Sequence, residues 1–329
     1  MPFSDSYARP IEYLRVSVTD RCNLRCRYCM PEEGIIPIAH DAVLRYEEIV
    51  RIVRVAVSMG LIHVRLTGGE PLVRRGIVDL VAQLAAIPGL GDLSMTTNGM
   101  LLERYAGELA QAGLRRINLS LDTLRPERFH NITRLGSLEQ VLRGREAALE
   151  AGLRPVKVNT VVVRGSNDDE IVDLARLTLL PDWHVRFIEV MPLGTGEHWS
   201  EDGVVPTTEI RARVEAGLGP LVSVPNETGV GPARYYQLPG AAGTLGFISP
   251  VSEHFCHACN RLRLTSDGLL LPCLMSDRSI DLRTPLRTGA SDSELREIFQ
   301  KAILAKPRGH QLAEHQLPEC LLPMSTIGG

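Results

Sequence analysis

The chain has 329 residues, 44% of them hydrophobic and 23% charged, and its formal net charge is −3 at pH 7. This length is sufficient for a large core, and the nearly neutral charge gives no reason to expect nucleic acid or a membrane as a partner. No run of about 18 apolar residues and no secretory signal is visible, so we expect a cytoplasmic protein. In that compartment the seven cysteines are expected to be ligands or reactive thiols rather than disulfides.

Strand-like and helix-like segments alternate along the first two thirds of the chain. Strands are expected at residues 14–18, 63–67, 93–97, 116–121, 156–163 and 184–190. Helices are expected at residues 46–59, 77–86, 102–112, 138–151 and 170–179. Repeated strand–helix units predict an α/β fold with a parallel sheet covered by outer helices.

Polar and apolar residues alternate within several of these strands, for example over residues 15–19, 65–67, 118–122 and 157–159. Successive side chains of a strand point to opposite faces, so the apolar row meets the helices and the polar row lines a cavity. Six strand–helix units are fewer than a full barrel contains. The pattern therefore predicts a partial (β/α)6 TIM-like barrel, with an ordinary doubly wound sheet as the alternative.

The first three cysteines stand in a compact C-x3-C-x2-C run directly after the first strand: Cys22, Cys26 and Cys29. Three thiolates suit an iron–sulfur cluster and leave one iron open for a small molecule. A zinc site is the alternative, but it normally needs a fourth Cys or His nearby, and only His40 is near. After the second strand, Gly68-Gly69 would let the backbone approach a ligand closely, although such a turn alone is weak support.

Beyond residue 191 the alternation fades and a second, mostly β region is expected. Strands are expected at 233–238, 244–248, 261–266 and 269–274, and helices at 208–214 and after the capping box formed by Ser291 and Glu294. We therefore predict a barrel domain at residues 1–229 and a smaller C-terminal domain at residues 230–329.

A second set of cysteines has C-x2-C-x13-C spacing: Cys256, Cys259 and Cys273. If Asp267-Gly268 is a two-residue hairpin turn, Cys273 pairs opposite Leu262 and comes close to Cys259. Alternation then places Arg261 and Arg263 on the face of Cys259, where two guanidiniums suit an anionic substrate. Three thiolates would again leave one iron open. A zinc ribbon completed by His254 or His257 is the alternative.

The N-terminal cysteine run, with Tyr28 before its third cysteine, and the Gly-Gly-Glu-Pro segment at residues 68–71 together resemble the radical S-adenosylmethionine (SAM) superfamily. The second cysteine set, its Cys-Asn-Arg-x-Arg segment at residues 259–263 and the final Gly-Gly extend the likeness. Over essentially its whole length the chain resembles the family of GTP 3′,8-cyclases, also called molybdenum cofactor biosynthesis protein A.

The resemblance implies a role for each candidate site residue. The ligands of two 4Fe–4S clusters would be Cys22, Cys26, Cys29, Cys256, Cys259 and Cys273. SAM would contact Tyr28, Gly69, Ser120, Asn159 and Met191. GTP would contact Arg15, Arg65, Thr96, Lys157, Arg261 and Arg263. Catalytic roles would fall to Arg261, Arg263, Gly328 and Gly329.

The activity implied by the resemblance is radical cyclisation of GTP to (8S)-3′,8-cyclo-7,8-dihydroguanosine 5′-triphosphate, an early step of molybdenum cofactor biosynthesis. Implied partners are GTP, a flavodoxin- or ferredoxin-like electron donor and the next enzyme of the pathway, with a homodimer left open. Another radical SAM enzyme with an auxiliary cluster, such as a peptide-modifying maturase, is the alternative. A non-enzymatic metal-binding adaptor is the most distant interpretation.

The C-terminal tail ends on Gly328-Gly329 after the segment 324–327, which is not a solvating sequence. Disorder is the usual state of a terminus. Two residues without side chains can nevertheless thread a narrow passage, and the resemblance points the same way. We therefore expect the tail to enter the active site.

Overall fold

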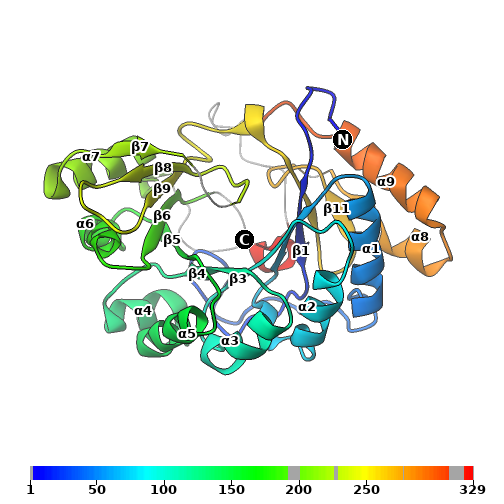
Figure 1. The fold of residues 1–329 in the computed structure, drawn as a ribbon, viewed down its shortest axis with the longest axis horizontal. Coiled ribbons are helices and arrows are strands. Elements are labelled where there is room, and N and C mark those ends of the chain that lie inside the picture. The colour runs from blue at the N-terminus through cyan, green and yellow to red at the C-terminus, as the bar shows by residue number, and fades with distance from the viewer. Residues whose placement is uncertain (1–2, 192–200, 226–228, 277, 311–321, 329) are drawn as a thin grey trace.

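The computed structural model describes residues 3–191, 201–225, 229–276, 278–310 and 322–328. A single curved sheet forms its centre, with helices on the outer face (Figure 1). The six expected strands are β1 (Tyr13–Ser17), β2 (His63–Thr67), β3 (Asp92–Thr97), β4 (Arg116–Ser120), β5 (Val156–Val162) and β6 (His184–Glu189). All six are parallel and neighbours in chain order, which confirms the partial barrel.

The helices between these strands follow the expected apolar periodicity. They are α1 (Tyr46–Ser58), α2 (Ile77–Ala85), α3 (Leu102–Gln111), α5 (Leu138–Glu150) and α6 (Ile171–Arg176). In α1, for example, Ile49 and Val53 belong to the core beneath the helix. None of the helices in the described part of the chain combines the length and the apolar character of a bilayer span.

One additional helix, α4 (Pro126–Thr133), has no counterpart among the predicted elements. It is only eight residues long and buries Phe129 and Ile132, so the sequence shows too few turns for an apolar period. Proline at its first turn favours the start of a helix. Its C-terminal end bears on function because the carbonyls of Ile132 and Thr133 accept bonds from the N-terminal cysteine loop.

The second region contains the expected strands, but they do not form a sheet of their own. Its elements are α7 (Thr207–Leu218), β7 (Val222–Val224), β8 (Arg234–Gln237), β9 (Leu245–Ile248), β10 (Arg261–Leu264), β11 (Leu269–Leu271), β12 (Ile280–Asp281), α8 (Arg283–Arg287), α9 (Asp292–Leu304) and α10 (Met324–Ile327). Strand β9 pairs parallel with β6, and β10 pairs parallel with β1, so both edges of the barrel sheet are extended. Antiparallel strands then flank each edge.

The connection between β9 and β10 therefore runs from one edge of the open barrel to the other. It covers residues 249–260 and carries Cys256 and Cys259 on a short 3-10 turn just before β10. The two regions thus share one continuous sheet. The domain boundary between residues 229 and 230 stays a prediction.

The hairpin that carries the second cysteine set differs from the predicted one by one residue. Arg263 pairs with Leu271, and the turn is a three-residue loop closed by a bond from the Thr265 amide to the Leu269 carbonyl, 2.9 Å long. Gly268 has φ +90°, the left-handed conformation of the third position in such loops. The predicted two-residue turn was wrong because the Asp267-Gly268 motif alone does not determine the length of the loop. If the observed pairing is extended along both strands, Cys273 lies opposite Arg261 rather than Leu262.

The alternation predicted for β10 is confirmed. Leu262 and Leu264 are buried in the hydrophobic core, whereas Arg261 and Arg263 take the opposite face and are also buried. That inner face encloses a space that we call the lumen. The predicted capping box is confirmed as well, since the Ser291 hydroxyl and the Glu294 carboxylate bond each other's backbone amides at the start of α9.

The continuous sheet predicts that the second region unfolds together with the barrel. Leu262→Ala, at a position with 0% exposure, should lower the free energy of unfolding by about 2–5 kcal/mol because it leaves a cavity beside β1. Urea unfolding should be followed by circular dichroism and by tryptophan fluorescence, since Trp183 lies at the start of β6 in the barrel.

Leu304→Ala is the matched control, because Leu304 is 60% exposed at the end of α9 and should change stability by no more than about 0.5 kcal/mol. Both probes should shift equally in Leu262→Ala. A fluorescence transition that stays at its original urea concentration while the dichroism transition splits would contradict a single cooperative sheet.

Candidate active site

The two cysteine sets lie at opposite ends of the lumen. Cys22, Cys26 and Cys29 follow the C-terminal end of β1, whereas Cys256 and Cys259 precede the N-terminal end of β10. Because β1 and β10 are parallel and Tyr13 pairs with Arg261, the start of one strand lies beside the start of the other. A molecule in the lumen is therefore flanked by one cysteine set at each end.

A cavity of about 210 Å³ opens beside the N-terminal cysteines. It is lined by all three of them and by every residue expected to contact SAM: Tyr28, Gly69, Ser120, Asn159 and Met191. Thr96, expected at GTP, lines the same cavity. The Asn159 side-chain oxygen is buried and accepts no hydrogen bond from any described residue, so a donor on a ligand could bond it.

The N-terminal cysteine loop is held in place by its backbone. The Cys29 and Met30 amides donate to the Cys26 carbonyl at 2.9 and 3.1 Å. The Leu24 amide and the Asn98 side chain approach the Cys22 sulfur at 3.4 and 3.8 Å. Burial raises the pKa of Cys22 to about 11 and that of Cys29 to about 12, so a bound metal must displace their protons.

The glycines at the end of β2 leave no room for side chains. A Cβ atom on Gly69 would stand 2.4 Å from the Arg21 carbonyl oxygen, and one on Gly68 would stand 2.4 Å from that of Thr19. The glycine backbone therefore lies directly against the residues before Cys22. Buried Glu70 fixes this turn by accepting bonds from the Thr97 hydroxyl and the Asn98 amide, both 2.7 Å long. Burial raises the pKa of Glu70 to about 7.

Asp122 is a cavity residue that the sequence analysis did not select. The Tyr28 hydroxyl donates to its carboxylate at 2.7 Å, and the Val161 amide donates to its other oxygen at 2.8 Å. Burial raises the pKa of Asp122 to about 6. The alternation over residues 118–122 was the available signal, since it places Asp122 in the same row as Ser120. The link orients Tyr28, the aromatic residue of the cysteine loop.

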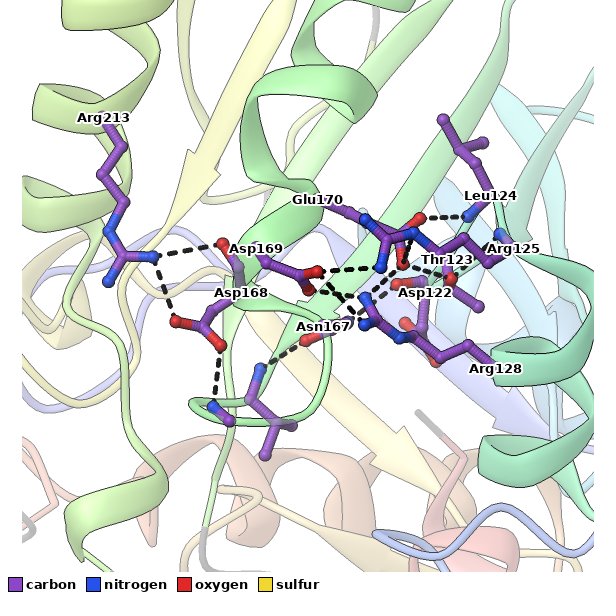
Figure 2. A network of polar contacts seen from close by, with 12 residues as sticks. Asp122, Thr123, Leu124, Arg125, Arg128, Asn167, Asp168, Asp169, Glu170 and Arg213 are labelled. Carbon is purple, nitrogen blue, oxygen red and sulfur yellow. Dashed lines mark hydrogen bonds and ion pairs between the residues drawn. The ribbon is translucent and has the colours of Figure 1, made fainter.

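Figure 2 shows the network that fixes the backbone around Asp122. The Asn167 amide group donates to the Asp122 carbonyl at 2.7 Å. Buried Glu170 accepts bonds from the Thr123 hydroxyl and the Leu124 amide, and Arg128 bonds Glu170 in turn. Figure 2 places these groups on the segments that follow β4 and β5, so the network holds two strand ends of the cavity together.

The lumen contains a row of buried or half-buried cations. Arg65, Arg15 and Arg263 lie side by side across β2, β1 and β10, because Arg15 pairs with both of the others in the sheet register. Arg261 and Arg186 are buried on the same inner surface. In the described ranges, none of these five arginines forms an ion pair with a carboxylate. Within the part of the chain that the structure describes, their positive charge therefore has no carboxylate counterion.

Crowding and burial disfavour the charged forms of these groups. Burial, reinforced by neighbouring arginines, lowers the pKa of Arg65 to about 9 and that of Lys157 to about 7. Burial also lowers the pKa of Arg263 well below its usual range. The Nε atoms of Arg15, Arg186 and Arg261 are buried and find no acceptor among the residues that the structure describes. Such a site gains most from a polyanion with many acceptor oxygens.

Lys157 and Arg65 form one end of this cation row in a pocket of about 300 Å³. Arg116, Arg186 and Tyr235 line it as well. Arg186 was missed although its signal was present, since it lies between Val185 and Phe187 in a polar-apolar alternation. Tyr13 was missed too; the guanidinium carbons of Arg15, Arg65 and Arg261 lie 5.5 to 5.9 Å from its ring centre.

The second cysteine set has an asymmetric electrostatic environment. Burial raises the pKa of Cys256. Burial acts in the same direction on Cys259, but Arg261 and Lys306 outweigh it and lower the pKa of Cys259 to about 7. The thiolate is the form that binds metal, so Cys259 is prepared for ligation at neutral pH. Arg261 thus lies beside both the cysteine set and the lumen.

The C-terminal tail enters the lumen, as expected, up to Gly328. Figure 1 shows α10 inside the curve of the sheet, and Met324 lines the cavity beside the N-terminal cysteines. The Gly328 carbonyl accepts a 2.6 Å bond from Arg263. A Cβ atom on Gly328 would stand 2.3 Å from Cγ2 of Thr67, and its φ is +82°, so only glycine fits. Gly329 lies outside the described residues.

The donor sets fit iron–sulfur clusters. All six cysteines of the two sets are free thiols. Each set supplies three of them, the ligand type of iron–sulfur clusters, and would leave one iron of a 4Fe–4S cluster without a protein ligand. A structural zinc site would need a fourth ligand beside each set.

Comparisons with known proteins agree with this geometry. Residues 16–178 match the family model of the Radical SAM superfamily, and residues 183–312 match that of Molybdenum Cofactor Synthesis C. The GTP 3′,8-cyclase of Heliobacterium modesticaldum is 55% identical and that of Pelotomaculum thermopropionicum 52%, each over 99% of both chains.

Among solved structures, SuiB of Streptococcus suis bound to S-adenosylmethionine has a similar fold. The TM-score is 0.57 at 16% sequence identity, and the match covers 80% of this chain and 60% of that one. This likeness concerns the fold alone.

Proposed function

Because this chain belongs to the family of GTP 3′,8-cyclases, which are radical SAM enzymes of molybdenum cofactor biosynthesis, we propose that it cyclises GTP inside the lumen. The observation that carries this assignment is the row of five arginines without a carboxylate partner. It lies between two sets of three cysteines, where a triphosphate would neutralise the buried charge.

Two 4Fe–4S clusters would be held by the two cysteine sets, one at each end of the lumen. Bound with SAM, the N-terminal cluster supplies the one-electron chemistry of the superfamily. The protein's own contribution is binding, orientation and the exclusion of water from a reactive radical. Gly328, which follows α10, lies against Thr67 and accepts a bond from Arg263, and would serve that last purpose.

SAM would occupy the cavity beside the N-terminal cysteines. The Gly69 backbone borders it, and Ser120 and the Asn159 oxygen offer polar atoms from neighbouring strands. Tyr28 is oriented by its bond to Asp122, and Met191 adds an apolar wall. Gly69, Ser120 and Met191 stand at the C-terminal end of a strand or just beyond it, the usual place for ligands in barrels of parallel strands, whereas Asn159 lies in the middle of β5.

GTP would extend across the lumen. The pocket formed by Arg65, Lys157 and Arg186 suits the triphosphate, and Arg15 continues the cation row toward β10. Arg261 and Arg263 would hold the other end of the nucleotide beside the second cysteine set. Thr96 lines the SAM cavity, so the ribose would pass close to the reacting group, which provides proximity between two atoms of one substrate.

We further propose the remaining partners from the chemistry. A one-electron donor of the flavodoxin or ferredoxin type would reduce the clusters, and the next enzyme of the pathway would receive the cyclised nucleotide. A cytoplasmic location suits reduced thiols and clusters. The barrel domain at residues 1–229 and the C-terminal domain at residues 230–329 would then each supply one cluster to a shared lumen.

Cysteine variants test the assignment of the two sets. Cys22→Ala should abolish SAM cleavage, whereas Cys273→Ala should retain the first cluster and some SAM cleavage but yield no cyclised nucleotide. Iron and sulfide should be counted after anaerobic reconstitution, and 5′-deoxyadenosine and cyclised GTP should be separated by chromatography.

Cys320→Ala is the matched control, because Cys320 is the one cysteine outside both sets. It should keep the full iron content and both products. If Cys22→Ala and Cys273→Ala also kept two clusters, the proposed ligands would be wrong.

Removal of Gly328-Gly329 tests the role of the tail. The deletion removes the carbonyl bonded to Arg263 and opens the lumen beside Thr67. Both clusters and the fold should remain, but the ratio of 5′-deoxyadenosine to cyclised nucleotide should rise because the radical is less well shielded or oriented. An unchanged ratio and rate would show that the tail has no part in the reaction.

A further inference from the structure

Lys306 is a buried cation close to the second cysteine set. It is one of three lysines in a chain with 36 lysines and arginines, and it is only 3% exposed. It stands two residues beyond the end of α9. Burying an ammonium costs desolvation free energy unless its hydrogen atoms find acceptors. The acceptors around Lys306 therefore indicate which groups it serves to hold.

The Lys306 ammonium bonds two carbonyls that stand next to cysteines of the second set. It donates to the Arg261 carbonyl at 2.9 Å and to the Pro272 carbonyl at 2.7 Å. Its positive charge also helps to lower the pKa of Cys259. Arg261 is two residues after Cys259, and Pro272 directly precedes Cys273. One side chain thus ties the two strands of the hairpin together where their cysteines stand.

A second buried cation fixes the segment that carries Lys306. Arg9 donates to the Pro307 and Arg308 carbonyls at 2.6 and 3.1 Å, and to the Cys256 carbonyl at 2.6 Å. Its own charge is balanced by Asp5. The third cysteine of the set is therefore connected to the same segment, and Lys306 is not free to move away from the site.

The residue type is informative in a chain that uses arginine almost everywhere. A guanidinium is a planar fork that suits acceptors lying in one plane, whereas an ammonium is compact and directs three donors around an axis. The two carbonyls, one from β10 and one just after β11, match the ammonium. The partners do not belong to α9, so a role in capping that helix does not account for them.

We propose that Lys306 is a positioning residue of the second cluster, which holds Cys259 and Cys273 at ligand distance and raises the reduction potential of the bound cluster. This proposal rests on the ligand assignment made above. Hydrogen bonds to the sulfurs and nearby positive charge favour the reduced, more negative form of an iron–sulfur centre. No other lysine among the described residues contacts either cysteine set.

The test compares Lys306→Met with Lys301→Met in the anaerobically reconstituted full-length protein. Lys301 is exposed on α9, so the same loss of charge occurs five positions away without any contact to the site. The readouts are iron content and the midpoint potential of the second cluster, obtained from an EPR-monitored redox titration. Neither depends on turnover.

Lys306→Met should lose part of the second cluster, and the fraction that remains should have a more negative potential than in Lys301→Met. Lys306→Arg should also retain less iron, because the planar fork does not fit the two carbonyls, but should keep the potential closer to that of the unchanged protein. Complete loss of the second cluster with the first cluster retained would equally support the proposal.

Equal iron content and equal potential in Lys306→Met and Lys301→Met would overturn the proposal. Loss of both clusters in Lys306→Met would also overturn it, because the residue would then serve general folding. A protein with only one cluster before any substitution would instead contradict the ligand assignment, so the two failures are distinguishable.

Discussion

The parallel pairing of β10 with β1 is the constraint on which the rest of the site depends. It sets Arg261 beside Tyr13 and Arg263 beside Arg15. A strand from the second region thereby adds two arginines to the inner face of the barrel. The same pairing places the second cysteine set at the end of the lumen opposite the first. Without it, the molecule would have two metal-binding loops but no space between them in which one substrate could meet both.

The lumen stores electrostatic free energy that a polyanion can release. Five arginines that form no ion pair with a carboxylate of the described residues, together with Lys157, are held close together by a hydrogen-bonded sheet, and burial prevents water from screening them fully. Repulsion between these cations lowers the stability of the free protein, and a bound polyanion removes that repulsion. The tail contributes from the other side: the Gly328 carbonyl bonds Arg263, so one lumen cation is oriented by a segment near the C-terminus. Lys306 has a different role, because its charge is directed at a cysteine and not at the lumen.

The sequence was sufficient to predict the barrel, but not how the second region joins it. Local spacing and alternation identified the cysteine sets, the glycine turn and the inward polar row, since each depends on neighbours in the chain. The joining of β9 and β10 to the barrel edges could not be predicted, because edge pairing depends on residues far apart in sequence. The predicted register of the hairpin was wrong by one residue for a related reason, since Asp267-Gly268 is compatible with both two- and three-residue loops. Asp122 and Lys306 were missed because their importance lies in partners, Tyr28 and Cys259, that sequence does not reveal.

The central claim is that the cations of the lumen bind the triphosphate of GTP. Burial, with Arg186 next in effect, lowers the pKa of Lys157 to about 7, so at a pH of about 8 most of the free protein carries this lysine uncharged. A bound triphosphate favours the ammonium and raises that pKa, so binding must take up protons and weaken as the pH rises above about 7. Calorimetry of GTP binding in two buffers of different ionisation enthalpy measures this uptake. The account predicts net proton uptake at pH about 8 that disappears in Lys157→Met; binding with no proton uptake would contradict it.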